Sequence, residues 1–531
     1  MDFPVLSLIT FFPLIGALAV LFIGNRDNQN AALLWKTGFI FAVAEFVLSL
    51  PVLVAFDSNT AAMQFTEHLP WIEGLGISYF LGVDGINLWL VLLTTFFVPL
   101  CLLCSFSYIQ KRIKEYIICF LLLETAMIGT LLALDLILFF VFWELMLIPM
   151  FLLIGIWGGQ RRIYSAVKFF LFTAVGSIFM LVAIIALYFY NLEATGVGTF
   201  NLLELYKLQL PGSVQLWLCS AFFLSFAIKV PMFPLHTWLP DAHVEAPTAG
   251  SVVLAGILLK MGGYGFIRFA MPLFPVATHQ FVPIIACLGA VAIIYAALVS
   301  WVQPDMKKLV AFSSVSHMGY VMLGLFALNI QGLEGGIYQM LNHGLSTGAL
   351  FLLVGMIYER RHTRLMDDFG GLAKVMPVFA TFLMIATLAS VAVPGTNGFV
   401  GEFLILLGAF KAYPFWAILG TSGALFGVIY MLWMYQRVMF GPVESSKNAG
   451  LSDLNPREIA TMVPVAVLII VMGFFPGLFL RKMDASVTHY VNMFETRYAL
   501  HQESSEPGAQ PPVKLARTNH SGSASGEAVQ D

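Results

Sequence analysis

Apolar stretches of about 20 residues recur along nearly the whole chain, and this feature restricts the possible folds more than any other. A helix needs roughly 20 apolar residues to cross a bilayer. In lipid only helices and closed barrels pair all their backbone polar groups, and these unbroken runs lack the alternation of barrel strands. Charged residues make up 11% of the chain, against about 25% in soluble domains. The sequence therefore predicts an all-α polytopic membrane protein.

About 14 transmembrane helices are predicted from apolar length and from polar or Gly/Pro punctuation. Their approximate limits are 3–23, 32–56, 83–106, 115–133, 136–156, 163–190, 214–239, 248–271, 280–301, 307–329, 334–358, 373–411, 415–441 and 458–480.

The distribution of basic residues predicts an orientation. Cytoplasmic connections are enriched in Lys and Arg. If the N-terminus faces outward, most basic residues fall on the inward connections, whereas the outward ones hold only Lys207, Arg268 and Lys411, with Arg481 and Lys482 just past the last span. Both termini are then expected on the periplasmic side of an inner (cytoplasmic) cell membrane.

Two of the predicted spans are interrupted. The seventh contains Pro231, Pro234 and Pro240, and the twelfth contains the segment PGTNGFVG from Pro394. Proline removes a helical hydrogen bond and clashes with the preceding turn. Broken helices in matching positions of two halves are typical of transporters with inverted repeats. The predicted organisation is three N-terminal helices (1–106), a first five-helix repeat (107–271), a second, inverted five-helix repeat (272–441), a C-terminal helix (442–482) and a disordered polar tail (483–531).

Several function classes receive no support. The net charge of −3 offers no basic surface for nucleic acid, and no G-x-G-x-x-G follows a predicted strand. Cys101 and Cys104 form a C-x-x-C inside an apolar run, with no second pair to complete a metal site. We expect the cysteines to be buried structural residues, and we expect no redox centre, bound cofactor or metal in this chain.

Ionisable residues in the middle of predicted spans are the candidate functional residues, because they are costly in a membrane and are functional by default. They are Glu144, Lys229, Lys260, His317, His343 and Glu402. A lysine without water holds its proton less firmly, and a nearby carboxylate restores the charged form. Histidine both accepts and donates protons near neutral pH. The set predicts a proton relay, with Glu144 next to Lys229 as a switchable pair.

Each candidate has a structural alternative. Glu144 and Lys229 could simply hold two helices together, and His317 and His343 could only hydrogen-bond neighbouring helices. His236 and His243 flank the first break and either control proton uptake or cap a loop. Glu124, in FLLLETAMIGT, is a weaker candidate of the same kind.

At these residues the sequence resembles the antiporter-like M chains of NADH–quinone oxidoreductase (respiratory complex I). The segments that carry the resemblance are LGVDGINLWLVLLTT from Leu81, FWELMLIPMFLLIGIWG from Phe142, KVPMFPLHTWLPDAHVEAPTAGSVVLAGILLKMGGYG from Lys229, QPDMKKLVAFSSVSHMGYV from Gln303, LNHGLSTGALFLLVG from Leu341 and PGTNGFVGEF from Pro394. Relatives that share part of this pattern are the L and N chains, the Mrp-type cation/proton antiporter subunits and membrane-bound hydrogenase subunits. Glu402 favours the M chains, because the other branches usually carry lysine there.

The resemblance implies 14 helices in two inverted repeats, with helices seven and twelve broken, and proton-carrying roles for the six candidate residues. It also implies the mechanism. NADH oxidation and quinone reduction, with FMN and iron–sulfur clusters, take place in partner subunits and drive proton translocation here. L-type and N-type chains are the implied membrane-arm neighbours. Lys229 takes up a proton from the inner side, Lys260 passes it on past the two histidines, and Glu402 releases it outward. The alternative is a subunit of an Mrp-type antiporter or membrane-bound hydrogenase.

Overall fold

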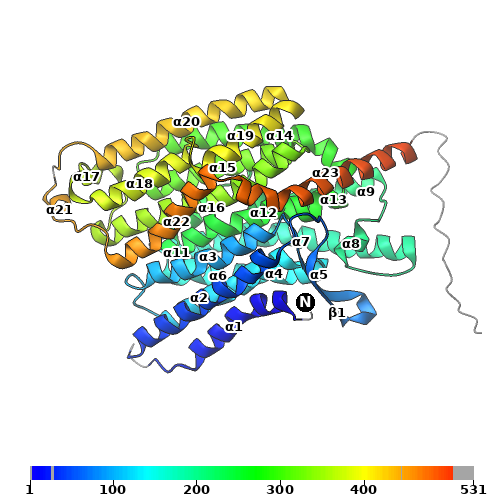
Figure 1. The fold of residues 1–531 in the computed structure, drawn as a ribbon, viewed down its shortest axis with the longest axis horizontal. Coiled ribbons are helices and arrows are strands. Elements are labelled where there is room, and N and C mark those ends of the chain that lie inside the picture. The colour runs from blue at the N-terminus through cyan, green and yellow to red at the C-terminus, as the bar shows by residue number, and fades with distance from the viewer. Residues whose placement is uncertain (1–2, 26–28, 444, 506–531) are drawn as a thin grey trace, which may run out of the picture.

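The computed structural model describes residues 3–25, 29–443 and 445–505, which form a bundle of long helices that run roughly side by side (Figure 1). Twelve helices in this part of the chain are long and apolar enough to cross a membrane. The other predicted spans correspond to α15 (Met306–Leu325) and to the interrupted pair α18 (Pro377–Ser390) and α19 (Asn397–Ala412). The prediction of an all-α polytopic membrane protein is confirmed.

The N-terminal part contains three long helices and a hairpin that the sequence did not predict. The elements are α1 (Val5–Phe22), α2 (Ala31–Ala55), β1 (Gln64–Ile72), η2 (Glu73–Leu75), β2 (Ile77–Val83) and α3 (Leu88–Ser105). The strands pair antiparallel, with His68 opposite Phe80. In Figure 1 the hairpin lies at the same end of the bundle as α8 (Leu202–Leu205) and the last turns of α23.

The first half of the bundle contains α4 (Ile113–Leu132), α5 (Leu136–Leu145), α6 (Leu147–Trp157), α7 (Arg162–Thr195), α9 (Gly212–Lys229), α10 (Trp238–Glu245), α11 (Thr248–Val253), η3 (Leu254–Leu258), α12 (Leu259–Gly265), η4 (Phe266–Ala270) and α13 (Met271–Leu273). Helix α9 ends at Lys229 and α10 begins at Trp238, so the predicted break in the seventh span is confirmed. The segments from α11 to α13 form one continuous, wholly buried span, in which η3 and η4 are π-helical turns.

The second half contains α14 (Pro275–Trp301), α15, α16 (Ile330–Arg361), η5 (Met366–Asp368), α17 (Leu372–Val375), α18, α19 and α20 (Pro414–Met439). It is followed by α21 (Ser446–Ala449), α22 (Pro456–Phe474) and α23 (Gly477–Ser505). The six residues between α18 and α19 form the predicted break in the twelfth span. The division of the chain into two repeats at the predicted boundaries stays a prediction.

The tail expected to be disordered from residue 483 is helical as far as Ser505, which corrects that expectation. Helix α23 packs against α14 and α16. The guanidinium of Arg497 donates to the carbonyls of Leu208 and Pro272, and the ring of His279 stacks on Tyr498 with centroids 3.7 Å apart. Disorder was expected because the tail lacks an apolar period. These polar and aromatic contacts hold the helix on the bundle without one. Residues 506–531 lie outside the described part of the chain.

Side chains at the helix ends satisfy exposed backbone N–H groups and tie segments together. Asp135 caps α5 by accepting from the N–H groups of Ile137 and Leu138, and its other oxygen accepts from the backbone and hydroxyl of Ser78. A side-chain cap of this kind satisfies backbone donors that the helix leaves open. The same carboxylate thus fixes the start of α5 and holds the hairpin against it. Helix α5 carries Glu144.

Candidate functional site

Glu402 on α19 and His317 on α15 are in direct contact inside the second half of the bundle. Nδ1 of His317 lies 3.2 Å from Oε1 of Glu402, and its Nε2 lies 3.3 Å from the hydroxyl of Ser390 at the end of α18. The amide of Gln339 on α16 donates to the same Glu402 oxygen at 3.1 Å. Both Glu402 and His317 are 6% exposed. Four helices therefore hold a buried carboxylate–imidazole pair beside the second helix break.

Lys260 and His343 form the second contact. Nζ of Lys260, in α12, lies 2.6 Å from Nδ1 of His343 on α16 and also donates to the carbonyl of Ala255. Each side chain is 1% exposed. The ring of His343 in turn neighbours that of His317, with centroids 5.6 Å apart. No partner for Lys260 is evident in the sequence, and in the structure His343 is its partner.

Four of the six predicted residues therefore line up in the order Lys260, His343, His317, Glu402. They come from α12, α16, α15 and α19, which lie far apart in the sequence and adjoin one another in the bundle. Neutral imidazole carries one donor and one acceptor nitrogen, so it takes a proton on one side and gives one on the other. The row can therefore pass protons between a buried lysine and a buried glutamate, but Nε2 of His343 has no hydrogen-bond partner in the described part of the chain, so the step between the two rings needs water or a ring movement.

Lys229 and Glu144 stand apart from this chain of contacts. Among the described residues, no ion pair joins them, and the ammonium of Lys229 has no hydrogen-bond partner. Instead it lies 5.2 Å from the ring centre of Trp143 and 5.8 Å from that of Phe169. Aromatic faces attract a cation. The charges of Glu144 and Lys229 still act on each other through the bundle, so the pair is coupled without touching.

The two histidines at the first break are both buried and lie differently. His236 is 4% exposed, and its ring neighbours Phe233 and Tyr295. His243 is wholly buried, stacks on Phe351 with centroids 4.7 Å apart, and has no hydrogen-bond partner on either ring nitrogen among the described residues. The charges of Lys307 and Lys260 both act on His243, and its two possible roles, proton uptake or loop capping, stay predictions.

Glycine allows the first broken span to pack closely on the span that carries Lys260. A Cβ atom at Gly262 would lie 2.8 Å from the backbone nitrogen of Val230 and 2.9 Å from the carbonyl oxygen of Phe226. Val230 directly follows Lys229, and Gly262 is two residues beyond Lys260. The helices that carry the two lysines thus meet backbone to backbone at this point.

Arg268 corrects one detail of the orientation argument, because it does not lie in an outward connection. It is 4% exposed within η4, and its guanidinium bonds Oδ1 of Asp84 at 2.6 Å and the hydroxyl of Tyr264 at 3.1 Å. Asp84 also accepts from the N–H groups of Ile86 and Asn87 at the start of α3. This buried ion pair joins the loop before α3 to the span that carries Lys260.

Sequence reasoning missed Gln339, Asn342, Ser390 and Trp143. Gln339 lies four residues before His343 on α16 and shares its face, and Asn342, three residues after Gln339, donates to Oε1 of Gln339 at 3.0 Å. A polar stripe of this kind within an apolar span is a signal that could have found them. Nothing in the local sequence places Ser390 beside His317, or Trp143, which directly precedes Glu144, beside Lys229. Within residues 3–25, 29–443 and 445–505, no group of three or more His, Cys, Asp or Glu side chains could hold a metal ion.

Long buried helices with two breaks and charged groups in the interior define an antiporter-like membrane subunit. A sequence model of the family described as "NADH:quinone oxidoreductase/Mrp antiporter, TM" matches residues 133–440. The chain is similar to NADH-quinone oxidoreductase subunit M of Rhodobacter capsulatus, with 48% identity over 505 residues that cover 92% of this chain and 96% of the relative.

Two solved structures give the same assignment of fold. The structure of respiratory complex I from Thermus thermophilus with bound NADH contains a chain that superimposes with a TM-score of 0.83 at 32% identity, covering 92% of this chain and 99% of that one. A chain of the Mrp complex from Dietzia sp. superimposes with a TM-score of 0.81 at 18% identity, covering 94% and 99%, which shows the shared fold alone. The chain belongs to the family of NADH-quinone oxidoreductase subunit M.

Proposed function

We propose that this chain translocates protons in the membrane arm of an NADH-quinone oxidoreductase, with Glu144, Lys229, Lys260, His343, His317 and Glu402 as the proton-carrying residues. The observation that supports this most is the buried row of contacts from Lys260 through two histidines to Glu402. Mid-membrane groups of this kind are costly, and four of them in a row, joined by two direct contacts and one pair of neighbouring rings, are difficult to explain as packing alone.

In the proposed sequence of steps, Lys229 takes up a proton from the inner side while Glu144 sets its affinity for the proton. Lys260 receives a proton next and passes it to His343, with which it is already in contact. His317 relays it to Glu402, which releases it outward. Because Lys229 has no hydrogen-bond partner in the described part of the chain, the step from Lys229 to Lys260 requires water or a side-chain movement.

The proposal assigns the redox chemistry to partner subunits. NADH, FMN, iron–sulfur clusters and quinone are bound there, and this chain binds none of them. L-type and N-type antiporter-like chains are its proposed neighbours in the membrane arm, and both termini face the periplasm. In support, Figure 1 places the start of α1 and the end of α23 toward the same end of the bundle. The Mrp-type alternative is supported only by the shared fold.

Replacing Lys260 by alanine in the complete complex tests the row of contacts. We expect assembly to survive and proton pumping to collapse together with NADH–quinone activity, because His343 loses the ammonium that touches it. The matched control is Lys207→Ala, since that lysine is exposed and pairs only with Glu204. Normal pumping by an assembled Lys260→Ala complex would refute the path.

Glu402 offers a test of what its site requires. If the site needs only a titratable group, Glu402→Lys should pump better than Glu402→Ala. Equal loss in both variants would mean that the acid itself is needed, which the bonds from Gln339 and His317 to one carboxylate oxygen support. Proton uptake per NADH oxidised, measured in proteoliposomes, separates the two outcomes.

A further inference from the structure

Two glutamates lie inside the bundle and take no part in the path described above. Glu45 is on α2 and Glu124 is on α4, and both side chains are completely buried. None of their four carboxyl oxygens has a hydrogen-bond partner in the described part of the chain. Buried polar groups nearly always have partners, so each exception needs an explanation.

The two side chains face each other. Helices α2 and α4 are separated by one antiparallel helix, so they run in the same direction and pack together. The two helices are in contact where Gly38 faces Ile117, since a Cβ atom at Gly38 would clash with Cγ2 of Ile117. Seven residues further along each helix are Glu45 and Glu124, and positions seven apart share a helix face. The charge of Glu45 acts directly on Glu124.

The described residues supply no ion-pair partner for the two glutamates. One turn beyond Glu45, the hydroxyl of Ser49 is already bonded to Thr95 at 2.9 Å and to the carbonyl of Phe46. On α3, the thiol of Cys101 lies near Glu124 and is directed to the carbonyl of Ala249 at 3.8 Å.

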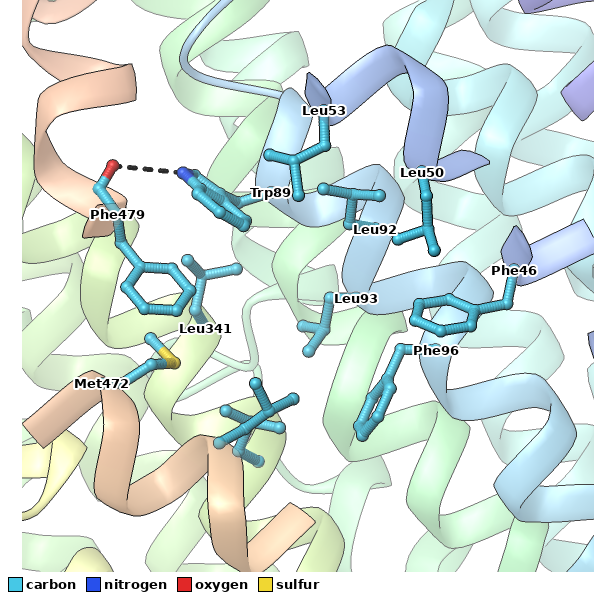
Figure 2. A pocket seen from close by; sticks show the side chains of 12 residues that line it. Phe46, Leu50, Leu53, Trp89, Leu92, Leu93, Phe96, Leu341, Met472 and Phe479 are labelled. Carbon is cyan, nitrogen blue, oxygen red and sulfur yellow. Dashed lines mark hydrogen bonds between the residues drawn. The ribbon is translucent and has the colours of Figure 1, made fainter. Parts of the chain in front are cut away.

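A cavity on another side of α2 offers no polar surroundings. It has a volume of about 220 Å³ and lies between α2, α3, α16, α22 and α23 (Figure 2). Its lining side chains, Phe46 and Leu50 among them, are apolar, and the indole N–H of Trp89 already donates to the carbonyl of Phe479 at 3.2 Å. Cavities with such a lining stay dry. Hydration from this side cannot stabilise a charge on Glu45.

Two facing carboxylates cannot both remain ionised under these conditions. A buried charge without a partner is strongly disfavoured, and the group neutralises instead. A second like charge nearby adds repulsion, so that one proton at least is retained by the pair. We propose that Glu45 and Glu124 form a second proton-binding site, which holds one or two protons at neutral pH and lies outside the row from Lys260 to Glu402.

Labelling with a hydrophobic carbodiimide tests the proposal on the unmodified complex, because the reagent adds to protonated carboxyl groups to give a stable N-acylurea. We expect an adduct on Glu45 or Glu124 at pH 7, located by peptide mass spectrometry. The exposed Glu193 near the end of α7 is the internal control. A glutamate in water is protonated in only roughly one molecule in 500 at pH 7. Absence of an adduct from both buried glutamates at pH 7 would overturn the proposal.

Infrared spectroscopy adds a measurement that does not depend on reagent access. The Glu124→Gln variant keeps the size of the side chain and removes the ionisable group. The difference spectrum between wild-type and variant complexes should show loss of the C=O band of a carboxylic acid from one of the two sites. Loss of carboxylate bands alone, in both Glu124→Gln and Glu45→Gln, would mean that both groups are ionised and would contradict the proposal. Neither result depends on whether Lys260 is required for pumping.

Discussion

The contact at Gly262 predicts that one methyl group there disturbs both lysine-bearing helices. The alanine Cβ would lie 2.6 Å from Cγ2 of Val230 and within 3 Å of two backbone atoms of α9 and the residue that follows it. Backbone atoms cannot turn aside as a flexible side chain does, so the helices must separate. Overpacking of this kind costs about 1–3 kcal/mol. The displacement occurs next to Lys229 and two residues from Lys260.

Gly256 provides the matched control, because it lies in the same span and has room. A Cβ atom there would meet nothing closer than 3.7 Å. Alanine gains up to about 1 kcal/mol over glycine in a helix, and this gain applies to both variants. The difference between Gly262→Ala and Gly256→Ala therefore isolates the strain of about 1–3 kcal/mol, which corresponds to roughly 5–150-fold in an equilibrium constant.

The assay compares the two variants in the complete complex. Large assemblies usually unfold irreversibly, so the half-life at a fixed elevated temperature is the appropriate stability measure. Proton pumping per NADH oxidised, in proteoliposomes, is the functional measure. We expect Gly262→Ala to have the shorter half-life and the lower pumping ratio, and Gly256→Ala to match the wild type. Indistinguishable behaviour of the two variants would refute the packing argument.

Three other substitutions have defined outcomes. Trp143→Leu removes the aromatic face nearest the Lys229 ammonium, which stabilises the protonated lysine by about 0.5–2 kcal/mol. We therefore expect the lysine to hold its proton less firmly, which a shifted pH profile of pumping would show. Asp84→Ala leaves the Arg268 guanidinium buried without its partner, which costs about 3–5 kcal/mol, so we expect a low yield of assembled complex. Asp84→Ala combined with Arg268→Met removes the unpaired charge and should recover part of that yield. Arg497→Ala should speed amide hydrogen exchange in the last turns of α23, and unchanged exchange would mean that its two carbonyl contacts do not hold the helix in place.

The sequence predicted the features that depend on a single segment. The apolar runs predicted the helices, because length and hydrophobicity decide whether a segment spans a membrane. Proline and glycine predicted the two breaks for an equally local reason. The tail after residue 482 was misjudged, since α23 is held by contacts of Arg497 and His279 with the bundle and not by an apolar stripe of its own.

The site was predicted as a set of residues but not as an arrangement. Six ionisable groups stood out in the sequence, and four of them are in contact or adjacent. Glu144 and Lys229 were predicted as a neighbouring pair. Their charges interact, but no ion pair joins them among the described residues, because helix registry and side-chain direction decide such contacts and neither is readable from one segment. The aromatic surroundings of Lys229 come from Trp143 on α5 and Phe169 on α7. Only the packed structure brings them together.

The two π-helical turns that flank Lys260 have a consequence for side-chain direction. A regular α-helix advances about 100° per residue, so one extra residue in a wide turn rotates all later side chains by about that angle. The turn at 254–258 precedes Lys260, and the turn at 266–270 contains Arg268. The first turn therefore sets the direction in which Lys260 points around the helix axis, toward His343. The second turn sets the direction of Arg268, toward Asp84. Removing one residue from the first turn would rotate Lys260 away from the histidine row while leaving its depth in the membrane nearly unchanged.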